Sequence, residues 1–216
     1  DRILPLDTTL RFNSYSPLDK PAFFQVYDPQ GKLNEAEIGS LVSRLGGDVS
    51  QIYRWKDYTL VMTLKETAKK MQKEWETSYP SIRSTVFDEQ FYSFRADQCA
   101  AGRPVADKDF VLLSAQLVED EDQQESYLEA HQTQYEKWPE VAQGFCNAGF
   151  QQVYVYKQGR QLLLLISFKK GQQFEEIDPL TTIDNPRVEE WNKLMSTYQQ
   201  GIEGTKEGET WIFFKK

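Results

Sequence analysis

The sequence predicts an α+β fold in which one chain carries two ferredoxin-like βαββαβ repeats. The first observation is an internal repeat: residues 45–62 resemble residues 148–165 at an offset of 103 (149 − 46), which aligns Gly46 with Gly149. The second is the alternation of short β-branched or aromatic runs with stretches of helical periodicity, in the same order in both halves. The order strand, helix, two strands, helix, strand is that of the ferredoxin-like unit.

The first repeat is expected to span residues 22–96. Asn34 is a suitable N-cap for its first helix, and the pair Gly46–Gly47 is a suitable end for that helix. Its second helix carries Trp75. The expected elements follow one another as strand 22–28, helix 34–46, a hairpin within 45–62, helix 65–79 and strand 89–96.

The second repeat is expected to span residues 109–216. An N-terminal extension (1–21) precedes the first repeat, and a linker (97–108) with Gly102 and Pro104 joins the two. The clearest elements of the second repeat are strand 109–118, a hairpin within 148–165, helix 185–200 and strand 209–216. Because a ferredoxin-like sheet leaves one face without helices, two repeats can bury those faces against each other. We therefore expect the two sheets to pack face to face as an intrachain version of the dimeric α/β barrel.

The composition disfavours several classes of partner. The formal net charge is −8, and the acidic residues are scattered along the chain. Nucleic acid and anionic membrane surfaces require basic patches, so neither is an expected partner. The longest apolar run, Leu162 to Ile166, is far shorter than the roughly 18 residues of a membrane span. Charge and hydropathy therefore favour a small-molecule ligand over a nucleic acid or a bilayer, and they leave the oligomeric state open.

The scarcity of histidine and cysteine limits the metal chemistry of the chain. One histidine and two distant cysteines, Cys99 and Cys146, cannot form a histidine- or cysteine-rich zinc site, and we expect neither a metal nor a cofactor. The two cysteines are either free thiols or one disulfide. The compartment also stays open between cytoplasmic and, if Asp1 follows a removed targeting segment, secreted or periplasmic.

The single histidine, His131, lies in the segment "YLEAHQTQYEKWPE" (127–140), which is rich in aromatic residues. Seven residues correspond to about 700° of helix rotation, so a continuous helix would place His131 and Trp138 on one face, with Tyr127 one turn before His131. Histidine titrates near neutrality and is suited to proton transfer. The alternatives are a solvent-facing histidine and an aromatic stripe that simply packs into the core.

Residues 127–200 resemble the L-rhamnose mutarotase family. The resemblance rests on "YLEAH", "KWPEVAQGFCNAG", "VYVYKQGRQLLLLISF" and "VEEWNKLMSTY" and covers about the second half of the chain. It implies an isomerase that interconverts the α and β anomers of a rhamnose-like monosaccharide. It also implies His131 as the catalytic proton-transfer group. The substrate-binding residues that it implies are Tyr127, Trp138, Tyr154, Trp191 and Asn192.

The chain departs from the family pattern at several positions. The pattern Tyr-x3-His-x3-Trp-Pro-Glu becomes Tyr127-x3-His131-x6-Trp138-Pro139-Glu140. Either three residues are inserted, or Gln134 takes the histidine position. The family tyrosine that follows the glycine is Val153 here, and Tyr154 would reach the same face only through a bulge. The second tryptophan of a family pair is Asn192.

These observations lead to a preferred function and two alternatives. The first hypothesis is a sugar mutarotase that opens and recloses the pyranose ring by acid–base catalysis. The second is a non-catalytic monosaccharide-binding or accessory protein on the same fold, which the departures favour. A third, a heme-degrading or cofactor-free monooxygenase on the same barrel, conflicts with the "WPE" and "EWxxLM" motifs. We expect one pocket, in the second repeat, because the 103-residue offset matches His131 and Trp138 only with Asp28 and Glu35.

Overall fold

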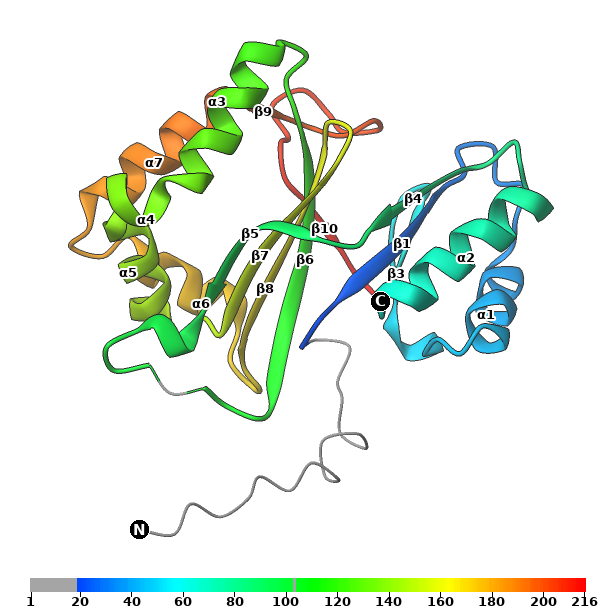
Figure 1. The fold of residues 1–216 in the computed structure, drawn as a ribbon, viewed down its shortest axis with the longest axis horizontal. Helices are drawn as coiled ribbons and strands as arrows, with labels where there is room; N and C mark the ends of the chain where they lie inside the picture. Colours follow the sequence, from blue (N-terminus) through cyan, green and yellow to red (C-terminus); the bar gives the residue numbers. More distant parts are fainter. Residues whose placement is uncertain (1–18, 103) are drawn as a thin grey trace, which may run out of the picture. The chain divides into compact units, whose positions relative to one another are not determined.

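A computed structural model describes residues 19–102 and 104–216, which form two compact units of mixed α and β structure (Figure 1). The first unit runs to Asp88 apart from residues 54–56, which group with the second unit, Glu89–Lys216. The expected N-terminal extension lies outside the described residues up to position 18. None of the helices in the described part of the chain is long and apolar enough to cross a membrane.

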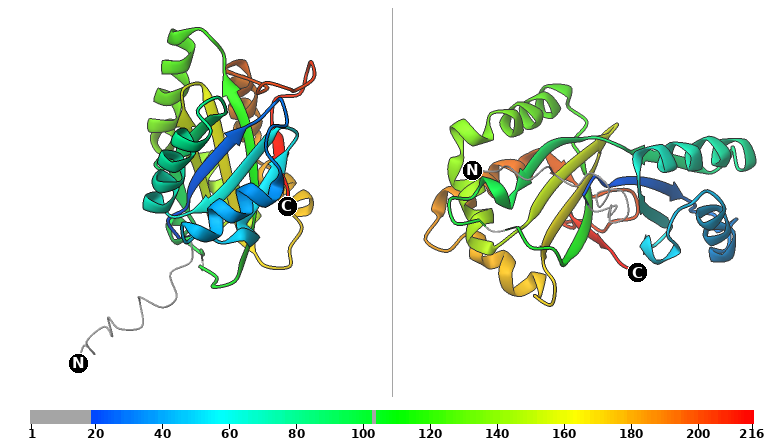
Figure 2. Two further views of the ribbon diagram at one scale, coloured as in Figure 1. Left: turned by 90° about the vertical axis from the view of Figure 1, so that its right-hand side faces the viewer. Right: turned by 60° about the horizontal axis from the view of Figure 1, so that its bottom comes forward.

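The first unit has the strand order expected of a ferredoxin-like repeat. Its antiparallel sheet runs β2-β3-β1-β4, and helices lie over one face (Figure 2). Asn34 accepts a hydrogen bond from the Glu37 backbone N–H at 2.9 Å and so caps the first helix as expected. The buried Trp75 packs edge-on against Phe24 beneath the sheet. The elements are β1 (Ala22–Tyr27), α1 (Glu35–Arg44), β2 (Ile52–Trp55), β3 (Tyr58–Thr63), α2 (Lys65–Ser78) and β4 (Arg83–Phe87), with a short 3-10 turn at Val49–Gln51.

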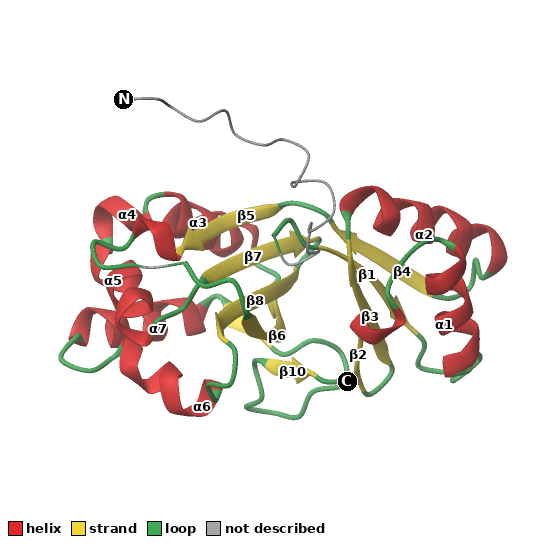
Figure 3. Cartoon of the chain, turned by 90° about the horizontal axis from the view of Figure 1, so that it is seen from below, coloured by secondary structure: helices red, strands yellow, loops and turns green. Residues whose placement is uncertain are grey.

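The second unit has this order as well and adds two strands, β5 and the short β9. Its sheet runs β10-β6-β8-β7-β5, and helices α3, α4, α5 and α7 lie on one face (Figure 3). The main elements are β5 (Gln90–Arg95), β6 (Lys108–Leu117), α3 (Glu121–Gln132), α4 (Gln134–Lys137), α5 (Pro139–Ala148), β7 (Gln152–Gln158), β8 (Gln161–Lys169), α6 (Phe174–Ile177), α7 (Pro186–Thr197) and β10 (Ile212–Phe214). Shorter pieces are 3-10 turns at Ala96–Gln98 and Asp178–Thr181 and the two-residue strand β9 (Gln199–Gln200).

Strand β5 corrects one expectation from the sequence. Residues 89–96 were expected to close the first repeat, but β5 pairs with β7 of the second sheet, and β4 closes the first sheet instead. Alternation along β5 explains its place, since Tyr92 and Phe94 are buried in the core of the second unit. The segment 97–108, expected to join the two repeats, therefore connects β5 to β6 within one sheet.

A disulfide fixes that connection to the helical layer. Cys99, just after β5, is bonded to Cys146 of α5, with their Cα atoms 5.8 Å apart. The two cysteines are therefore paired, which decides between the alternatives that the sequence left open. The bond ties the end of β5 to a helix that packs over the same sheet.

The helical region between β6 and β7 is broken twice. Helix α3 ends at Thr133, the short α4 follows, and α5 begins at Pro139. Proline suits the first position of a helix because it lacks an N–H that would be unpaired there. Gly149 ends α5 with a positive φ of 73°, a conformation that costs glycine little. Three short helices thus replace the single continuous helix on which the facing of His131 and Trp138 was predicted.

Candidate functional site

The second unit contains a cavity of about 450 Å³ between its sheet and its helices. Such a volume falls in the range of roughly 300–1,000 Å³ that small-molecule sites occupy. Apolar residues of β7 and β8, such as Val153 and Ile166, form the floor. Aromatic rings line the walls, and the lining also includes polar residues from several elements, among them His131, Gln134, Thr181, Asn192, Ser196 and Gln199.

His131 lies in the last turn of α3 and is 8% exposed. Its Nδ1 is 2.9 Å from the Tyr127 carbonyl oxygen, which can only accept a hydrogen bond. In the neutral imidazole Nδ1 therefore carries the proton and Nε2 the lone pair. Burial lowers the pKa of His131 to about 4, although the hydrogen bond to Tyr127 partly opposes the shift. The side chain is therefore a neutral base at pH 7.

Four aromatic rings surround the imidazole and account for this dry environment. The centroid distances from His131 are 4.3 Å to Tyr127, 5.1 Å to Trp191, 5.4 Å to Tyr92 and 5.6 Å to Phe91. Aromatic surfaces offer a charged imidazolium little of the solvation that water would supply, so they favour the neutral form. The same surfaces suit the apolar C–H face of a sugar ring.

Tyr127 and Gln199 form a second polar group on the cavity wall. The Tyr127 hydroxyl is hydrogen bonded to the Gln199 side chain, and the Trp211 indole N–H donates to Gln199 Oε1 at 3.2 Å. Burial raises the pKa of Tyr127, so its hydroxyl stays protonated and can donate. Sequence reasoning did not find Gln199 or Trp211. The aromatic run at 209–216 indicated a strand, and nothing in the spacing pointed Trp211 toward a site.

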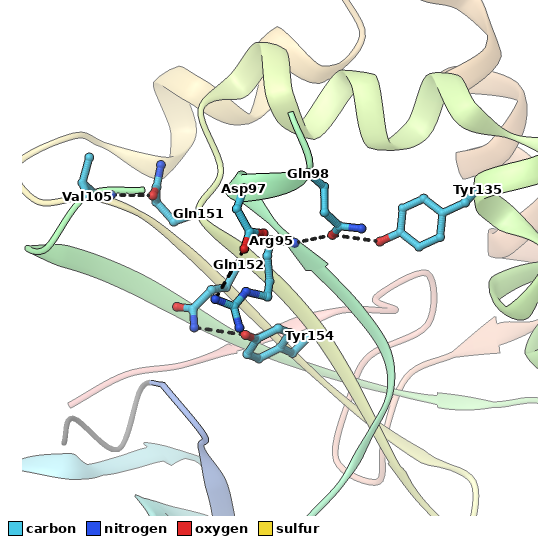
Figure 4. A network of polar contacts seen from close by, with 8 residues as sticks. All are labelled: Arg95, Asp97, Gln98, Val105, Tyr135, Gln151, Gln152 and Tyr154. Atoms are coloured by element: carbon cyan, nitrogen blue, oxygen red, sulfur yellow. Dashed lines mark hydrogen bonds and ion pairs between the residues drawn. The ribbon is translucent and has the colours of Figure 1, made fainter. Parts of the chain in front are cut away.

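Strand β5 and helix α4 add a third polar group. The buried Tyr92 hydroxyl donates to Oε1 of the buried Gln134, and both residues line the cavity. Next to them, the Tyr135 hydroxyl donates to the Ser93 carbonyl at 2.6 Å. Figure 4 shows Tyr135 reaching Gln98, which also accepts from the Arg95 backbone N–H at 2.8 Å. Tyr92 was missed from the sequence because β5 was assigned to the other repeat.

The comparisons with known proteins concern the same unit. Residues 113–216 match the family model of L-rhamnose mutarotase. The second half of the chain resembles that family. An L-fucose mutarotase of Xanthomonas campestris pv. campestris is 29% identical over 80 residues, which are 35% of this chain and 60% of that protein. The mutarotase match thus covers α3, α5 and α7 but leaves out β5.

Within the mutarotase-like segment, the expected site residues divide into two groups. Tyr127, His131, Trp191 and Asn192 line one cavity. Trp138 does not line it: its ring lies behind Trp191 at a centroid distance of 5.6 Å, and the Arg187 guanidinium stacks on it at 3.8 Å. The helix on which the alignment of Trp138 with His131 was predicted is broken between the two residues, where α3 ends at Gln132 and α4 begins at Gln134.

Tyr154 is the other expected residue that the cavity excludes. Strand β7 pairs with β8 without a register shift, so no bulge brings Tyr154 to the helix-covered face. Val153 lines the cavity instead. The Tyr154 hydroxyl accepts a hydrogen bond from Gln152 Nε2 at 3.2 Å, on the opposite side of the sheet (Figure 4). The mutarotase tyrosine position is thus occupied by an apolar side chain.

The cavity contains few ionisable groups. Apart from tyrosines, only His131 and Asp178 carry titratable side chains among its lining residues, and burial raises the pKa of Asp178. Within residues 19–102 and 104–216, no group of three or more histidine, cysteine or acidic side chains is placed to hold a metal ion. The arrangement offers hydrogen bonds, aromatic surface and one buried base.

Proposed function

We propose that this protein is a mutarotase that interconverts the α and β pyranose forms of a neutral, rhamnose-like monosaccharide. The observation that carries the proposal is the position of His131. His131 lines a cavity together with Tyr127 and Trp191, and its Nε2 has no hydrogen-bond partner among the described residues, within the segment that matches the mutarotase family.

The chemistry needs one proton to move between two oxygens of the sugar. In the ring-opening step Nε2 of His131 takes the proton of the anomeric hydroxyl, the bond between C1 and the ring oxygen breaks, and C1 becomes an aldehyde. The imidazolium then returns the proton to the former ring oxygen. Rotation about the C1–C2 bond and the reverse steps close the ring as the other anomer. His131 ends in its starting state, as a catalyst must.

The lining supports an uncharged sugar as the substrate. Trp191 supplies an aromatic surface for the C–H face, and the Tyr127 hydroxyl and Asn192 supply hydrogen bonds. Asn192 is exposed, at the rim of the cavity. No lysine or arginine lies among the described lining residues to balance a phosphate or carboxylate. L-Rhamnose and L-fucose are therefore the first sugars to test.

The test is saturation transfer between the anomeric protons of each sugar by NMR, with wild type and His131→Asn. Asparagine keeps an N–H near the Tyr127 carbonyl but removes the base at Nε2. The structure favours it over alanine, which would leave a void because His131 is buried. We expect exchange to slow by roughly 10²–10⁴-fold.

Gln132→Asn is the matched control. It shortens an exposed side chain on the same turn of α3 and should leave the exchange rate unchanged. Equal rates for wild type and His131→Asn would remove His131 from the catalytic role.

A non-catalytic sugar-binding protein is the second candidate. The observation in its favour is Val153, which lines the cavity at the family's tyrosine position and can neither donate nor accept a proton. A wild-type protein that binds a monosaccharide but leaves its anomers unexchanged would establish this alternative.

We also propose that the two units form an intrachain α/β barrel with sheets face to face. The two sheets share one strand order, which is β4-β1-β3-β2 in the first unit and β10-β6-β8-β7 in the second. This shared order supports the proposal, together with the 103-residue repeat. A crystal structure in which the two sheets do not touch would contradict it.

A further inference from the structure

Strand β5 brings polar chemistry to the cavity from outside the segment that matches the mutarotase family. The match begins at residue 113, whereas Tyr92 lies on β5, Gln90–Arg95. Its partner Gln134 lies on α4, in the stretch where this chain has three residues more than the family pattern between histidine and tryptophan. Both side chains line the cavity, and Gln134 is 1% exposed.

The hydrogen bond from Tyr92 determines which end of the Gln134 amide is available. Oε1 of Gln134 accepts the Tyr92 hydroxyl, so the amide oxygen is occupied. The amide nitrogen has no hydrogen-bond partner among the described residues. Within that part of the chain, only Glu140 Oε2 and Arg160 Nη2 are fully enclosed side-chain atoms without a hydrogen-bond partner, so the amide nitrogen of Gln134 is not fully enclosed by protein. A buried amide N–H that lacks a protein partner is stabilised by a ligand acceptor.

Gln134 and His131 present complementary groups. His131 Nε2 carries a lone pair and has no described partner, while Gln134 Nε2 carries two N–H groups. A sugar hydroxyl both donates and accepts hydrogen bonds, so neighbouring hydroxyls of one ring can satisfy an acceptor and a donor together. The two residues are three positions apart, on either side of the break at Thr133.

We propose that Gln134 is a direct sugar-binding residue and that Tyr92 is the positioning residue that directs its amide N–H into the cavity. This inference rests on the proposed binding of a monosaccharide, but it does not require turnover. The ligand class is a neutral pyranose whose hydroxyl oxygen accepts from Gln134 while another part of the ring lies against His131 and Trp191. Strand β5 thereby becomes an element that determines which sugars bind.

The matched variants use two hydrogen bonds that join β5 to α4. Tyr92→Phe removes the bond to Gln134 inside the cavity. Tyr135→Phe removes the bonds of the Tyr135 hydroxyl to the Ser93 carbonyl, Gln98 and the Tyr92 hydroxyl, and leaves the bond from Tyr92 to Gln134 in place. Each variant loses one hydroxyl that links β5 to α4. If these hydroxyls had a purely structural role, the two variants should affect sugar binding equally. Gln134→Met keeps the length of the side chain and removes both polar atoms.

The experiment measures sugar binding by NMR titration and anomer exchange as a function of sugar concentration, with L-rhamnose and L-fucose. For Gln134→Met and Tyr92→Phe we expect Kd and KM to rise about tenfold, the contribution of one neutral hydrogen bond, with little change in kcat. The ratio of the two sugars' affinities should also change. Tyr135→Phe should retain wild-type values, and melting temperatures verify that each variant is folded.

The outcomes separate this inference from the proposed reaction. Wild-type affinity in both Gln134→Met and Tyr92→Phe, or equal losses in Tyr92→Phe and Tyr135→Phe, would overturn the inference while the mutarotase proposal stands. Weakened binding in the variants of a protein that shows no exchange would support the inference and refute the reaction. If wild type binds neither sugar, both are overturned.

Discussion

At the scale of single residues, the site depends on how burial changes the chemistry of His131. Water would leave a histidine half-protonated near pH 6.5, but burial among four aromatic rings holds this one neutral, against the opposing effect of its hydrogen bond to the Tyr127 carbonyl. The imidazole is therefore in its neutral, proton-accepting form over the whole physiological pH range, and its low pKa makes it a weaker base than a histidine in water. The same low pKa makes the imidazolium a stronger acid, which favours return of the proton to the ring oxygen.

This lowered pKa predicts how stability depends on pH. The pKa of His131 is about 4 in the folded protein, against about 6.5 in the unfolded chain. Between these values the unfolded chain binds a proton that the folded protein does not. The contribution of His131 to the free energy of unfolding is therefore fully present above about pH 6.5. As the pH falls toward 4, the free energy of unfolding decreases by on the order of 3 kcal/mol.

Urea unfolding of wild type and His131→Asn at pH 7 and pH 4.5 measures this effect. The free energy of unfolding should fall more steeply for wild type, because asparagine has no proton to bind. Parallel losses in the two proteins would show that His131 is not the group responsible.

At the scale of secondary structure, β5 contributes Tyr92 to the cavity wall, and a disulfide anchors this strand. The disulfide between Cys99 and Cys146 closes 47 residues of chain and anchors the end of β5 to α5. Replacing both cysteines by alanine should lower the free energy of unfolding by about 2–5 kcal/mol, since the unfolded chain regains the entropy that the cross-link removes. Urea titrations measure this loss, and dithiothreitol should lower the free energy of unfolding of wild type to that of the double variant. A double variant within about 0.5 kcal/mol of oxidised wild type would contradict this role.

The elements also show which parts of the fold follow from sequence. Individual strands were predictable because alternation along a strand is a local signal, and the structure has strands at 22–27, 58–63 and 161–169. The pairing partner of β5 was not predictable from sequence. The segments "RSTVF" (β4) and "QFYSFR" (β5) are both acceptable strands, and only tertiary packing decides which sheet each one joins.

The site residues follow the same division. Tyr127 and His131, one turn apart on α3, were predictable from helical spacing as neighbours, and both line the cavity. The position of Trp138 was not predictable from helical spacing, because that spacing assumes a continuous helix and the chain breaks at Thr133. Gln199 and Trp211 reach the site from segments that come together only in the folded unit.

At the scale of the whole molecule, the two units share a strand order, but only the second has the mutarotase-like segment and the sugar site proposed for it. The 103-residue offset matches His131 with Asp28 and Trp138 with Glu35. The Asp28 carboxylate accepts backbone N–H groups of Lys32 and Leu33, each at 3.1 Å, and so stabilises the turn before α1. Helix α1 begins only at Glu35, so the first unit has no helical turn at the position where α3 carries His131.

One sugar should therefore bind per chain, in the second unit. A calorimetric or NMR titration with L-rhamnose or L-fucose should give a stoichiometry near one sugar per chain. Gln134→Met should weaken binding at that one site, and no second binding site should become detectable. Asp28→Asn supplies the complementary measurement: it changes the position that matches His131 but leaves an oxygen for the backbone N–H groups, so neither affinity nor anomer exchange should change. A stoichiometry near two, or a loss of binding in Asp28→Asn, would show that the first unit has a sugar-binding site of its own.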